Sequence, residues 1–272
     1  MIEGQNGVSW PEWVALARAC EEHGVGTLFR SDHYLNLDGD AARGSLDAWA
    51  TIAALAAVTT TVRLGTLVSP ATFRHPSALA KAVVVADHVS GGRVELGLGA
   101  GWHEREHEAY GFEFPAVAER FDRLAEQLEI VHGHWAQGPF TFNGRHYALE
   151  RLDAQPKPVQ RPHPPLLMGG AAGPRAAALA ARWADEYNTV EPTLEQVHER
   201  RDRIARACAA AGRAPIPFSV MTNFRRRAAD ELLERLSAWR DAGVARVMLQ
   251  HLEHRDLDSV AFIGRELAPR LS

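Results

Sequence analysis

Residues that can do chemistry are concentrated in five short segments, each of which follows an apolar run of the sequence. The segments are Glu3-Gly4-Gln5-Asn6, Ser31-Asp32-His33-Tyr34, Ser69-Pro70-Ala71-Thr72, Gly99-Ala100-Gly101-Trp102-His103 and Gly169-Gly170-Ala171-Ala172-Gly173. If the apolar runs are parallel strands of one barrel, these segments follow the carboxyl ends of the strands, where barrel enzymes carry their active sites. The sequence therefore predicts one site built from several loops.

Asp32 and His33 place a carboxylate beside an imidazole, a pair that can move protons near pH 7 if His33 faces the site. Adjacent residues on a strand point to opposite faces, so we expect only one of the two to reach a ligand. The pair by itself also fits a role in capping the end of a strand.

The glycine-rich segment from Gly169 to Pro174 runs from an apolar strand directly into a helical stretch. Its small residues would let a phosphate approach backbone N–H groups at the helix N-terminus, with Arg175 beside them. The alternative is that the glycines only make a tight turn between strand and helix.

Gly97, Gly99 and Gly101 form a second glycine-rich segment with the spacing G-x-G-x-G. This spacing, and the lack of an acidic residue that ends a second strand about 20 positions further on, argue against a dinucleotide-binding fingerprint. We expect the glycines to remove side chains so that a flat ring can lie against the backbone. Trp102 then either forms a wall of the ring site or packs on the barrel rim.

The segment from His103 to His107 matches the H-E-x-x-H motif of zinc proteases. Such proteases carry the motif on a long helix with a third ligand downstream, whereas here it directly follows the glycine-rich strand end. We expect no metal, and either a polar lid or a solvated first helical turn with Glu104 and Glu106 near its N-terminus. A metal hydrolase would draw on His33, His103 and His251, and stays a minor alternative.

Composition narrows the class of protein further. The 30 basic and 34 acidic residues give a net charge of −4, which argues against a nucleic-acid partner; the run Arg225-Arg226-Arg227 is expected to be a solvated face, or else to reach an anionic tail. Cys20 and Cys208 lie in helical stretches and predict buried free thiols rather than a disulfide framework. No apolar run approaches the roughly 18 residues of a membrane span and no signal peptide is visible, so we expect a cytoplasmic protein.

Strands and helices alternate along the whole chain, which is typical of parallel βα units. The expected strands are 1–4, 26–30, 63–68, 94–98, 165–168, 186–189, 217–221 and 245–250, and the expected helices are 11–23, 46–59, 76–89, 116–135, 174–183, 194–211, 228–242 and 257–267. Eight of each without a break at the midpoint favour an α/β fold closed as a (β/α)8 TIM barrel over an open doubly wound sheet. We expect one domain over residues 1–272.

One segment interrupts this alternation after the fourth βα unit. Asn143-Gly144 lies between alternating aromatic positions in the stretch from Phe140 to Tyr147, which is a strong signal for a β-hairpin. Prolines 156, 158, 162, 164 and 165 then predict extended chain that leads back to the fifth strand. We therefore expect a β-hairpin insertion but no domain boundary here.

Several blocks of the sequence resemble the luciferase-like monooxygenase family, and within it the branch of oxidoreductases that depend on the deazaflavin coenzyme F420. The blocks are 21–24 with 29–33, 63–66 with 73–76, 87–93 with 97–102 and 106–111, 156–162, and 168–170 with 184–188. They follow one another in the expected order, and together they are far more specific than any single block.

The resemblance implies a luciferase-like barrel with a flavin-type ring at its mouth and the cofactor phosphate on the loop after the fifth strand. His33 is the implied catalytic proton donor or acceptor, with Asp32 beside it, and Leu67–Val68 matches a site where relatives hold a non-prolyl cis peptide behind the ring. The implied cofactor-binding residues are Gln5, Asp32, His33, Leu67, Val68, Gly99, Ala100, Gly101, Trp102, Gly169, Gly170, Ala171 and Asn188.

Two departures from the family pattern matter. Sugar-phosphate dehydrogenases of this branch have an acidic residue where this chain has Trp102 and a tryptophan where it has Leu37, so their substrate is not expected here. Relatives also begin with several more apolar residues before the segment that matches Ile2 to Gln5. Either the first strand is shortened or the true start lies upstream of Met1, and we expect the latter.

The hypothesis that follows is hydride transfer between coenzyme F420 and a small organic substrate, with a proton moved by His33. The alternatives are an FMN-dependent monooxygenase and, from another class, a non-catalytic protein that only binds a flavin or deazaflavin. The resemblance also implies a homodimer.

Overall fold

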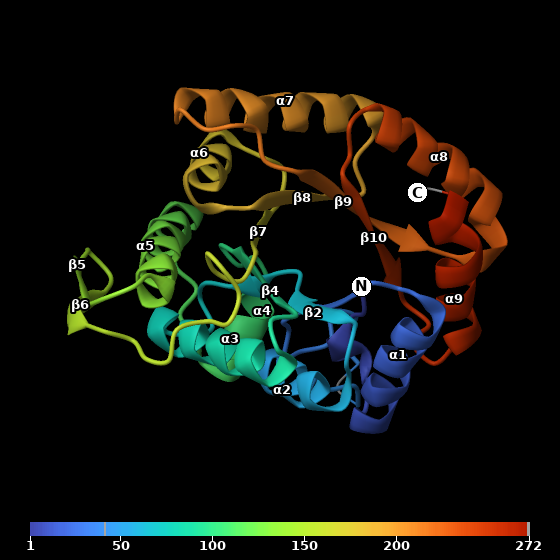
Figure 1. The fold of residues 1–272 in the computed structure, drawn as a ribbon, viewed down its shortest axis with the longest axis horizontal. Helices are drawn as coiled ribbons and strands as arrows, with labels where there is room; N and C mark the ends of the chain where they lie inside the picture. The colour runs from blue at the N-terminus through green and yellow to red at the C-terminus, as the bar shows by residue number, and fades with distance from the viewer. Residues whose placement is uncertain (41, 271–272) are drawn as a thin grey trace.

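The computed structural model describes residues 1–40 and 42–270 and has a parallel β-barrel at its centre (Figure 1). The strands pair in the order β1-β2-β4-β7-β8-β9-β10, with β3 also paired to β4, and all these pairings are parallel. Their bounds are β1 Thr27–Arg30, β2 Arg63–Thr66, β3 Ser69–Pro70, β4 Val94–Gly99, β7 Leu166–Gly169, β8 Glu186–Val190, β9 Phe218–Phe224 and β10 Arg246–His251. The predicted barrel class is confirmed.

The barrel closes through two residues instead of the expected strand at residues 1–4. The Met1 amino group donates to Leu249 O (2.8 Å) and Met1 O accepts from His251 N (2.9 Å), which joins this segment to β10. On the other side Ile2 N donates to Phe29 O (3.0 Å), which joins it to β1. The extended segment ends at Glu3, because Gly4 N donates to Ser31 Oγ and Gly4–Asn6 forms a 3₁₀ turn.

Helices surround the barrel close to their predicted positions (Figure 1). Their bounds are α1 Trp10–His23, α2 Ala48–Val58, α3 Pro76–Ser90, α4 Glu104–Tyr110, α5 Val117–Trp135, α6 Pro174–Trp183, α7 Leu194–Ala210, α8 Ala229–Asp241 and α9 Leu257–Phe262, which a π-turn (Ile263–Leu267) and a 3₁₀ turn (Ala268–Arg270) continue; a 3₁₀ turn (Arg226–Ala228) precedes α8. Local caps fix several ends: Ser9 N donates to the Glu12 carboxylate (2.7 Å) at the start of α1, and Gly24 ends it with φ +75°. Among the described residues no helix is long and apolar enough to cross a membrane.

An antiparallel pair, β5 (Phe140–Asn143) and β6 (Ala148–Leu152), follows α5 and projects from the barrel (Figure 1). The chain turns between the two strands at residues 144–147, where Gly144 N donates to Tyr147 O (2.9 Å). Glu126 of α5 holds this turn, because its carboxylate accepts from the N–H groups of Arg145, His146 and Tyr147 (2.7, 3.0 and 3.0 Å). The helix therefore stabilises the turn.

Four charged side chains pair inside the amino-terminal end of the barrel. Glu95 of β4 binds Arg63 of β2 (2.7 Å) and Arg246 of β10 (2.8 Å), and Arg246 also binds Glu186 of β8 (2.7 Å). Burial by itself raises the pKa of Glu95, but the hydrogen bonds from Arg246 and Arg63 outweigh it and lower that pKa. Both pairs of Arg246 join strands that are not paired with each other in the sheet, whereas Arg63 and Glu95 lie on the neighbouring strands β2 and β4.

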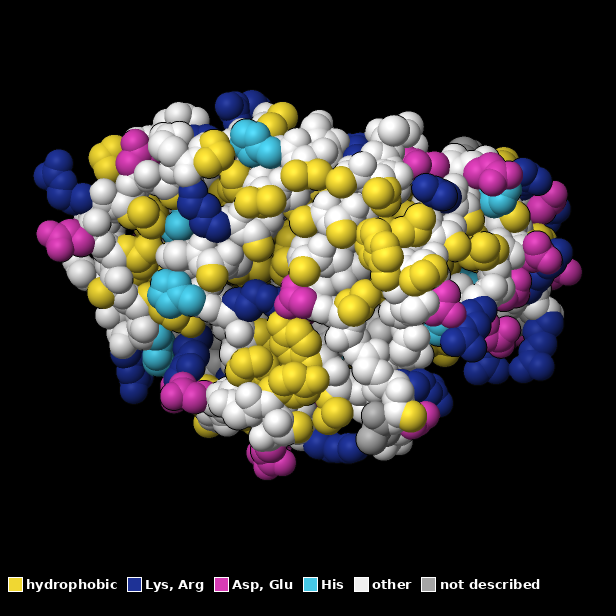
Figure 2. Space-filling model, turned by 90° about the horizontal axis from the view of Figure 1, so that it is seen from below, with side chains coloured by type: hydrophobic (Ala, Val, Ile, Leu, Met, Phe, Trp, Pro, Cys, Tyr) yellow, Lys and Arg dark blue, Asp and Glu magenta, His cyan; other side chains and the backbone are white. Residues whose placement is uncertain are grey.

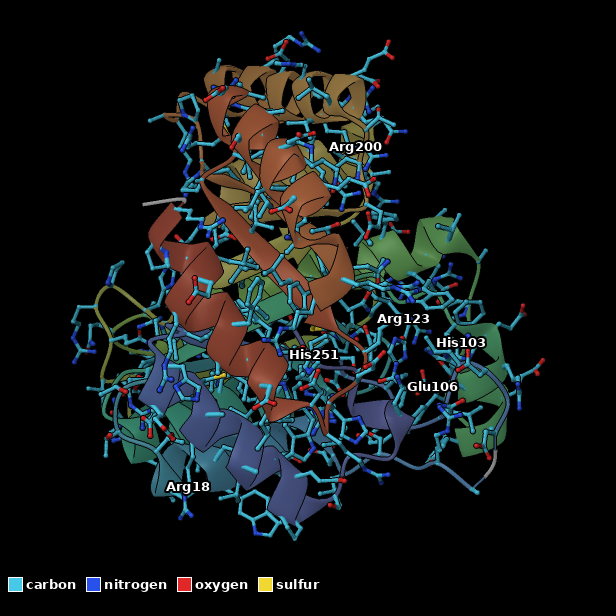
Figure 3. All side chains as sticks on the ribbon, turned by 90° about the vertical axis from the view of Figure 1, so that its right-hand side faces the viewer. Arg18, His103, Glu106, Arg123, Arg200 and His251 are labelled. Atoms are coloured by element: carbon cyan, nitrogen blue, oxygen red, sulfur yellow. The ribbon has the colours of Figure 1, made fainter. Side chains whose placement is uncertain are left out.

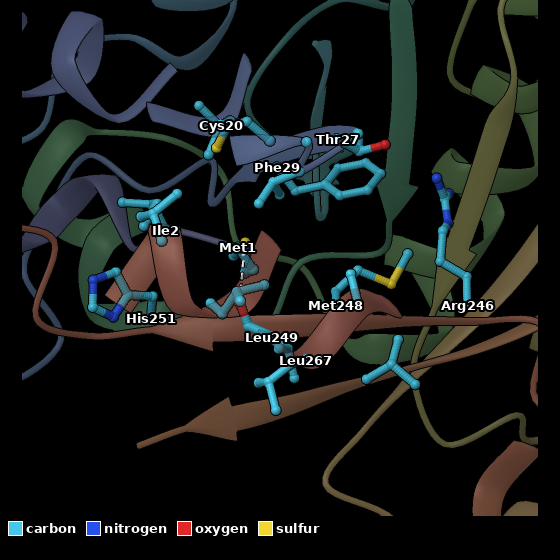
Figure 4. A pocket seen from close by; sticks show the side chains of 18 of the residues that line it. Met1, Ile2, Cys20, Thr27, Phe29, Arg246, Met248, Leu249, His251 and Leu267 are labelled. Carbon is cyan, nitrogen blue, oxygen red and sulfur yellow. Dashed lines mark hydrogen bonds between the residues drawn. The ribbon is translucent and has the colours of Figure 1, made fainter. Parts of the chain in front are cut away.

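An apolar cavity of about 290 Å³ lies beside β1, β10, α1 and α9 (Figure 4). Met1, Phe29 and Leu249 line it, and so does Cys20, whose pKa burial raises to about 11. Cys20 and Cys208 are both buried and free, which confirms the prediction from the sequence.

We predict that Glu95→Gln lowers the free energy of unfolding by about 3 kcal/mol, because it leaves the arginines of a buried ion-pair network short of a counter-charge. Because its native pKa is lowered, the ionised Glu95 stabilises the protein at neutral pH, and this contribution is lost as the pH falls below about 4. Urea unfolding followed by circular dichroism at pH 7 measures the change. Glu129→Gln is the control, since its pair with Arg182 is exposed and is worth less than about 1 kcal/mol; equal effects of the two substitutions would contradict the prediction.

Candidate active site

A cavity of about 620 Å³ opens at the carboxyl ends of the strands, within the size range of sites for small molecules and cofactors. It joins loops from most of the barrel. The predicted site residues that line it are His33, Leu67, Val68, Gly99, Ala100, Gly101, Trp102, Gly169, Gly170 and Asn188. Gln5, Asp32 and Ala171 are not among the described residues that line it.

The rear wall of the cavity is the segment between β2 and β3, where the Leu67–Val68 peptide is cis, as the family resemblance implied. Two nearby glycines make room for this segment. A Cβ at Gly97 or Gly99 would lie 2.9 or 2.8 Å from the side chain of Val68. Both glycines therefore make room for Val68, which itself lines the cavity, and Gly99 lines the cavity as well; the expectation that they also leave space for a ring stays a prediction.

Asp32 lies behind the cavity wall in a buried ion pair. Its side chain is 1% exposed, its two oxygens lie 2.6 and 3.1 Å from the guanidinium nitrogens of Arg74, and Ser69 Oγ donates to it (2.6 Å). Arg74 also binds Asp47, the N-cap residue of α2 (2.6 Å). As the strand geometry predicts, only one residue of the Asp32–His33 pair lines the cavity, and it is His33.

Gln5 does not line the cavity but is hydrogen-bonded to two residues that do. Its Oε1 accepts from Ser31 Oγ (2.5 Å) and its Nε2 donates to Glu3 (2.6 Å), and Gln250 donates to the other oxygen of Glu3. Glu3, Ser31 and Gln250 all line the cavity. Glu3 and Ser31 were in the segments singled out in the sequence but were not predicted to contact a ligand, because nothing there says which polar side chain of a loop turns inward.

His33 is held by Glu106 of α4, the short helix over the cavity. His33 Nδ1 lies 2.8 Å from Glu106 Oε2, and the other carboxylate oxygen accepts from the N–H groups of Tyr34 and Leu35. Glu106 is fully buried, so the expectation of a solvated first turn is wrong for this residue. Figure 3 labels Glu106 and His103 at the same end of the barrel.

Both H-E-x-x-H histidines line the cavity, and the side chain of His107 also makes structural contacts. His107 Nδ1 donates to His103 O (2.7 Å), and its Nε2 pairs with Thr72 Oγ1 (2.6 Å). Across residues 1–40 and 42–270 no group of three or more His, Cys, Asp or Glu side chains is arranged to hold a metal ion.

The loop after β7, the predicted phosphate site, uses some of its N–H groups for contacts within the protein. Gly170 has φ +139°, a conformation for glycine, but its N–H donates to Asn188 O (3.0 Å), and Ala172 N–H donates to Tyr187 Oη (3.0 Å). The loop amides without a protein acceptor in the described part of the chain are those of Ala171 and Gly173. Arg175 pairs with Asp122 of α5 instead of facing the loop.

Much of the remaining wall is apolar, and apart from Phe73 it comes from positions that the sequence does not single out. Phe73 precedes α3, and Val117, Phe121 and Leu124 lie on one side of α5. Trp102 lines the mouth with 64% of its surface exposed, and its ring lies 5.7 Å from that of His33. The run Arg225-Arg226-Arg227 is exposed, as expected, and lines a separate polar cavity with Glu253 and Asp256.

Comparisons with known proteins agree with this architecture. A model of the family "luciferase-like monooxygenase" matches residues 2–265. An uncharacterized protein of Mycobacterium tuberculosis is 30% identical, and the match covers 95% of this chain and 93% of that protein.

Two further similarities concern proteins of known activity. An F420-dependent glucose-6-phosphate dehydrogenase of Nakamurella multipartita is 36% identical over 65% of this chain and 51% of its own length. The solved structure of an F420-dependent secondary alcohol dehydrogenase, in complex with an F420-acetone adduct, superposes over 100% of this chain and 99% of its own with a TM-score of 0.86 at 19% identity.

We predict that Arg74→Met destabilises the protein by about 3 kcal/mol, because it leaves the buried Asp32 carboxylate without its cation. Thermal and urea unfolding give the change in stability. Arg240→Met is the matched control, because Arg240 is half exposed and lies 3.6 Å from its sequence neighbour Asp241. A loss no greater than that of the control would show that Asp32 does not depend on Arg74.

Proposed function

The chain belongs to the luciferase-like monooxygenase family, and from that premise we propose that it transfers hydride between coenzyme F420 and a small organic substrate. The single observation that carries the proposal is the cavity at the carboxyl ends of the strands, with an apolar rear wall, an anchored imidazole and a glycine loop. When bound, the deazaflavin ring supplies the hydride chemistry.

The residues of the cavity fit such a group. Leu67 and Val68, together with Gly99 and Ala100, offer a largely apolar surface for a ring. Gly169 and Gly170 line the cavity at the other side, and the next amides along this loop, those of Ala171 and Gly173, have no protein acceptor among the described residues; they precede the N-terminus of α6, where backbone N–H groups and the helix dipole favour an anion. We propose that this loop holds the cofactor phosphate, with Asn188 beside it.

The chain's own contribution is to orient the ring, exclude water and move a proton. His33 is the proposed proton carrier, because it lines the cavity and its Nδ1 is already occupied by Glu106. Asp32 is proposed to act indirectly, by keeping the end of β1 in place through Arg74.

The substrate side of the cavity supports a weakly polar molecule. Among the described residues that line the cavity, Arg120 is the only lysine or arginine. Its guanidinium is already engaged, because it lies 4.0 Å from the ring centre of Phe114 and its Nη1 donates to Pro115 O (2.6 Å). Val117, Phe121 and Leu124 surround it with apolar surface. We propose a neutral alcohol or carbonyl compound rather than a phosphorylated sugar.

We predict that the protein binds coenzyme F420 at least tenfold more tightly than FMN. Titration of the apo-protein with each cofactor, followed by its visible absorbance, measures both dissociation constants. Tighter binding of FMN would overturn the choice of cofactor and favour a flavin monooxygenase, and binding of neither would overturn the proposed function.

We further propose a homodimer that forms through α2 and α3. The outward side of α2 carries Ala50, Ala54, Ala57 and Val58 without a charged residue, and α3 adds Val85 and Val89, which are 53% and 46% exposed. Figure 2 views this side of the molecule, and hydrophobic side chains form patches across it. Exposed apolar patches of this kind mark protein–protein contacts.

We predict that the wild-type protein has a mass of about twice 29.9 kDa in size-exclusion chromatography with light scattering. Val85→Asp should shift it to the monomer, because it would place two unpaired carboxylates in an apolar interface. Leu194→Asp, at the exposed start of α7, is the control and should leave the mass unchanged. A monomeric wild type, or a dimer unaffected by Val85→Asp, would contradict this proposal.

A further inference from the structure

We propose that Glu106 is a positioning residue that fixes the tautomer of His33, so that Nδ1 carries the proton and Nε2 is the nitrogen presented to the cavity. This inference rests on the proposed function only where it concerns turnover; the tautomer itself is a property of the protein without cofactor.

The contact between the two residues is specific. Glu106 Oε2 lies 2.8 Å from His33 Nδ1, and the Glu106 side chain is fully buried while that of His33 is 15% exposed. No other hydrogen bond of the His33 ring occurs in the described part of the chain. Since Nε2 is on the opposite edge of the ring from Nδ1, it is the nitrogen that remains for a ligand.

The charge on Glu106 is maintained in spite of its burial. Desolvation by itself raises the pKa of Glu106, but the hydrogen bond and charge of His33 and the N–H groups of Leu35 and Tyr34 outweigh it and lower that pKa. An ionised carboxylate can only accept hydrogen bonds. His33 Nδ1 must therefore donate, and in the neutral ring Nε2 must be the acceptor.

The second oxygen of Glu106 makes its orientation unambiguous. It accepts from the backbone N–H groups of Tyr34 and Leu35, which can only donate. In Glu106→Gln the amide oxygen must stay with these two donors, so the amide NH2 faces His33 Nδ1. That nitrogen must then accept, and the neutral ring is forced into the tautomer with its proton on Nε2.

The other groups around His33 do not impose a tautomer. The rings of Trp102 and His103 lie 5.7 and 6.1 Å from its ring, both nearly perpendicular to it. Asp32, its chain neighbour, is paired with Arg74. Glu3 lines the same cavity but is held by Gln5 and Gln250. This leaves Glu106 as the group that decides which nitrogen carries the proton.

A neutral imidazole with a free Nε2 acceptor can take a proton from an alcohol, and its protonated form can return a proton to the oxygen of a carbonyl compound. In both directions the proton moves between His33 Nε2 and the substrate oxygen, while the Nδ1 proton stays with Glu106. In the Gln variant Nε2 already holds the single proton of the neutral ring and has no lone pair with which to accept another.

Two-bond ¹H–¹⁵N correlation spectra of the apo-protein test the tautomer directly. The spectra are recorded at rising pH until the His33 shifts no longer change, and His33→Asn assigns the signals. We expect the Nδ1–H tautomer in the wild type and in Glu104→Gln, a control at an exposed position of the same helix, and the Nε2–H tautomer in Glu106→Gln. A wild-type ring protonated on Nε2, or a Gln variant that keeps the Nδ1–H form, would overturn the proposal.

Turnover with F420 provides a second, separate readout. Glu106→Gln should lower kcat for alcohol oxidation by about 10²-fold, with the dissociation constant for F420 changed less than twofold, and should have no further effect in a His33→Ala background. Equal losses in both backgrounds would mean a merely structural role and would overturn the proposal. If the wild type shows no turnover with F420, the proposed function fails, while the spectra still decide the tautomer.

Discussion

The site depends on the partners of Asp32 and His33, two consecutive polar residues that follow β1 and point to opposite sides of the cavity wall. Asp32 turns behind the wall and is neutralised by Arg74, and His33 turns into the cavity and is held by Glu106. Arg74 comes from the next βα unit and Glu106 from the helix after β4, so both contacts require these neighbouring units to pack side by side. A buried carboxylate without a partner would be costly, and thus the same pairs that stabilise the fold also orient the imidazole.

Much of the fold and several site residues could be predicted from the sequence, because they follow from local rules. Strand and helix periods gave the barrel, and the position of Gly169 and His33 at strand ends placed them at the mouth. The first strand was wrong in detail, because a hydrogen bond from Gly4 to Ser31 overrides local preference, and nothing in the sequence indicates that the carboxylate of Glu126 holds the hairpin turn. Such long-range partners leave no periodic signal.

The roles of individual side chains were harder to predict for the same reason. Glu106 lies in a segment rich in charge and reads as solvated, yet His33, more than 70 positions earlier, provides its partner and the fold buries it completely. Gly97 and Gly99 were predicted to leave space for a ring, and the structure shows in addition that both make room for Val68. In both cases the sequence indicates that a position is special, and only the packing of a neighbouring βα unit says why.

The central claim is that the cavity at the carboxyl ends of the strands binds the cofactor ring next to an imidazole held by Glu106. A crystal structure of the protein grown with coenzyme F420 tests this claim most directly. The account predicts the ring against Leu67 and Val68, its phosphate at the amides of Ala171 and Gly173, and the His33–Glu106 contact intact. A ring bound elsewhere, for example in the polar cavity beside Arg225, or a His33 side chain turned away from Glu106, would contradict it.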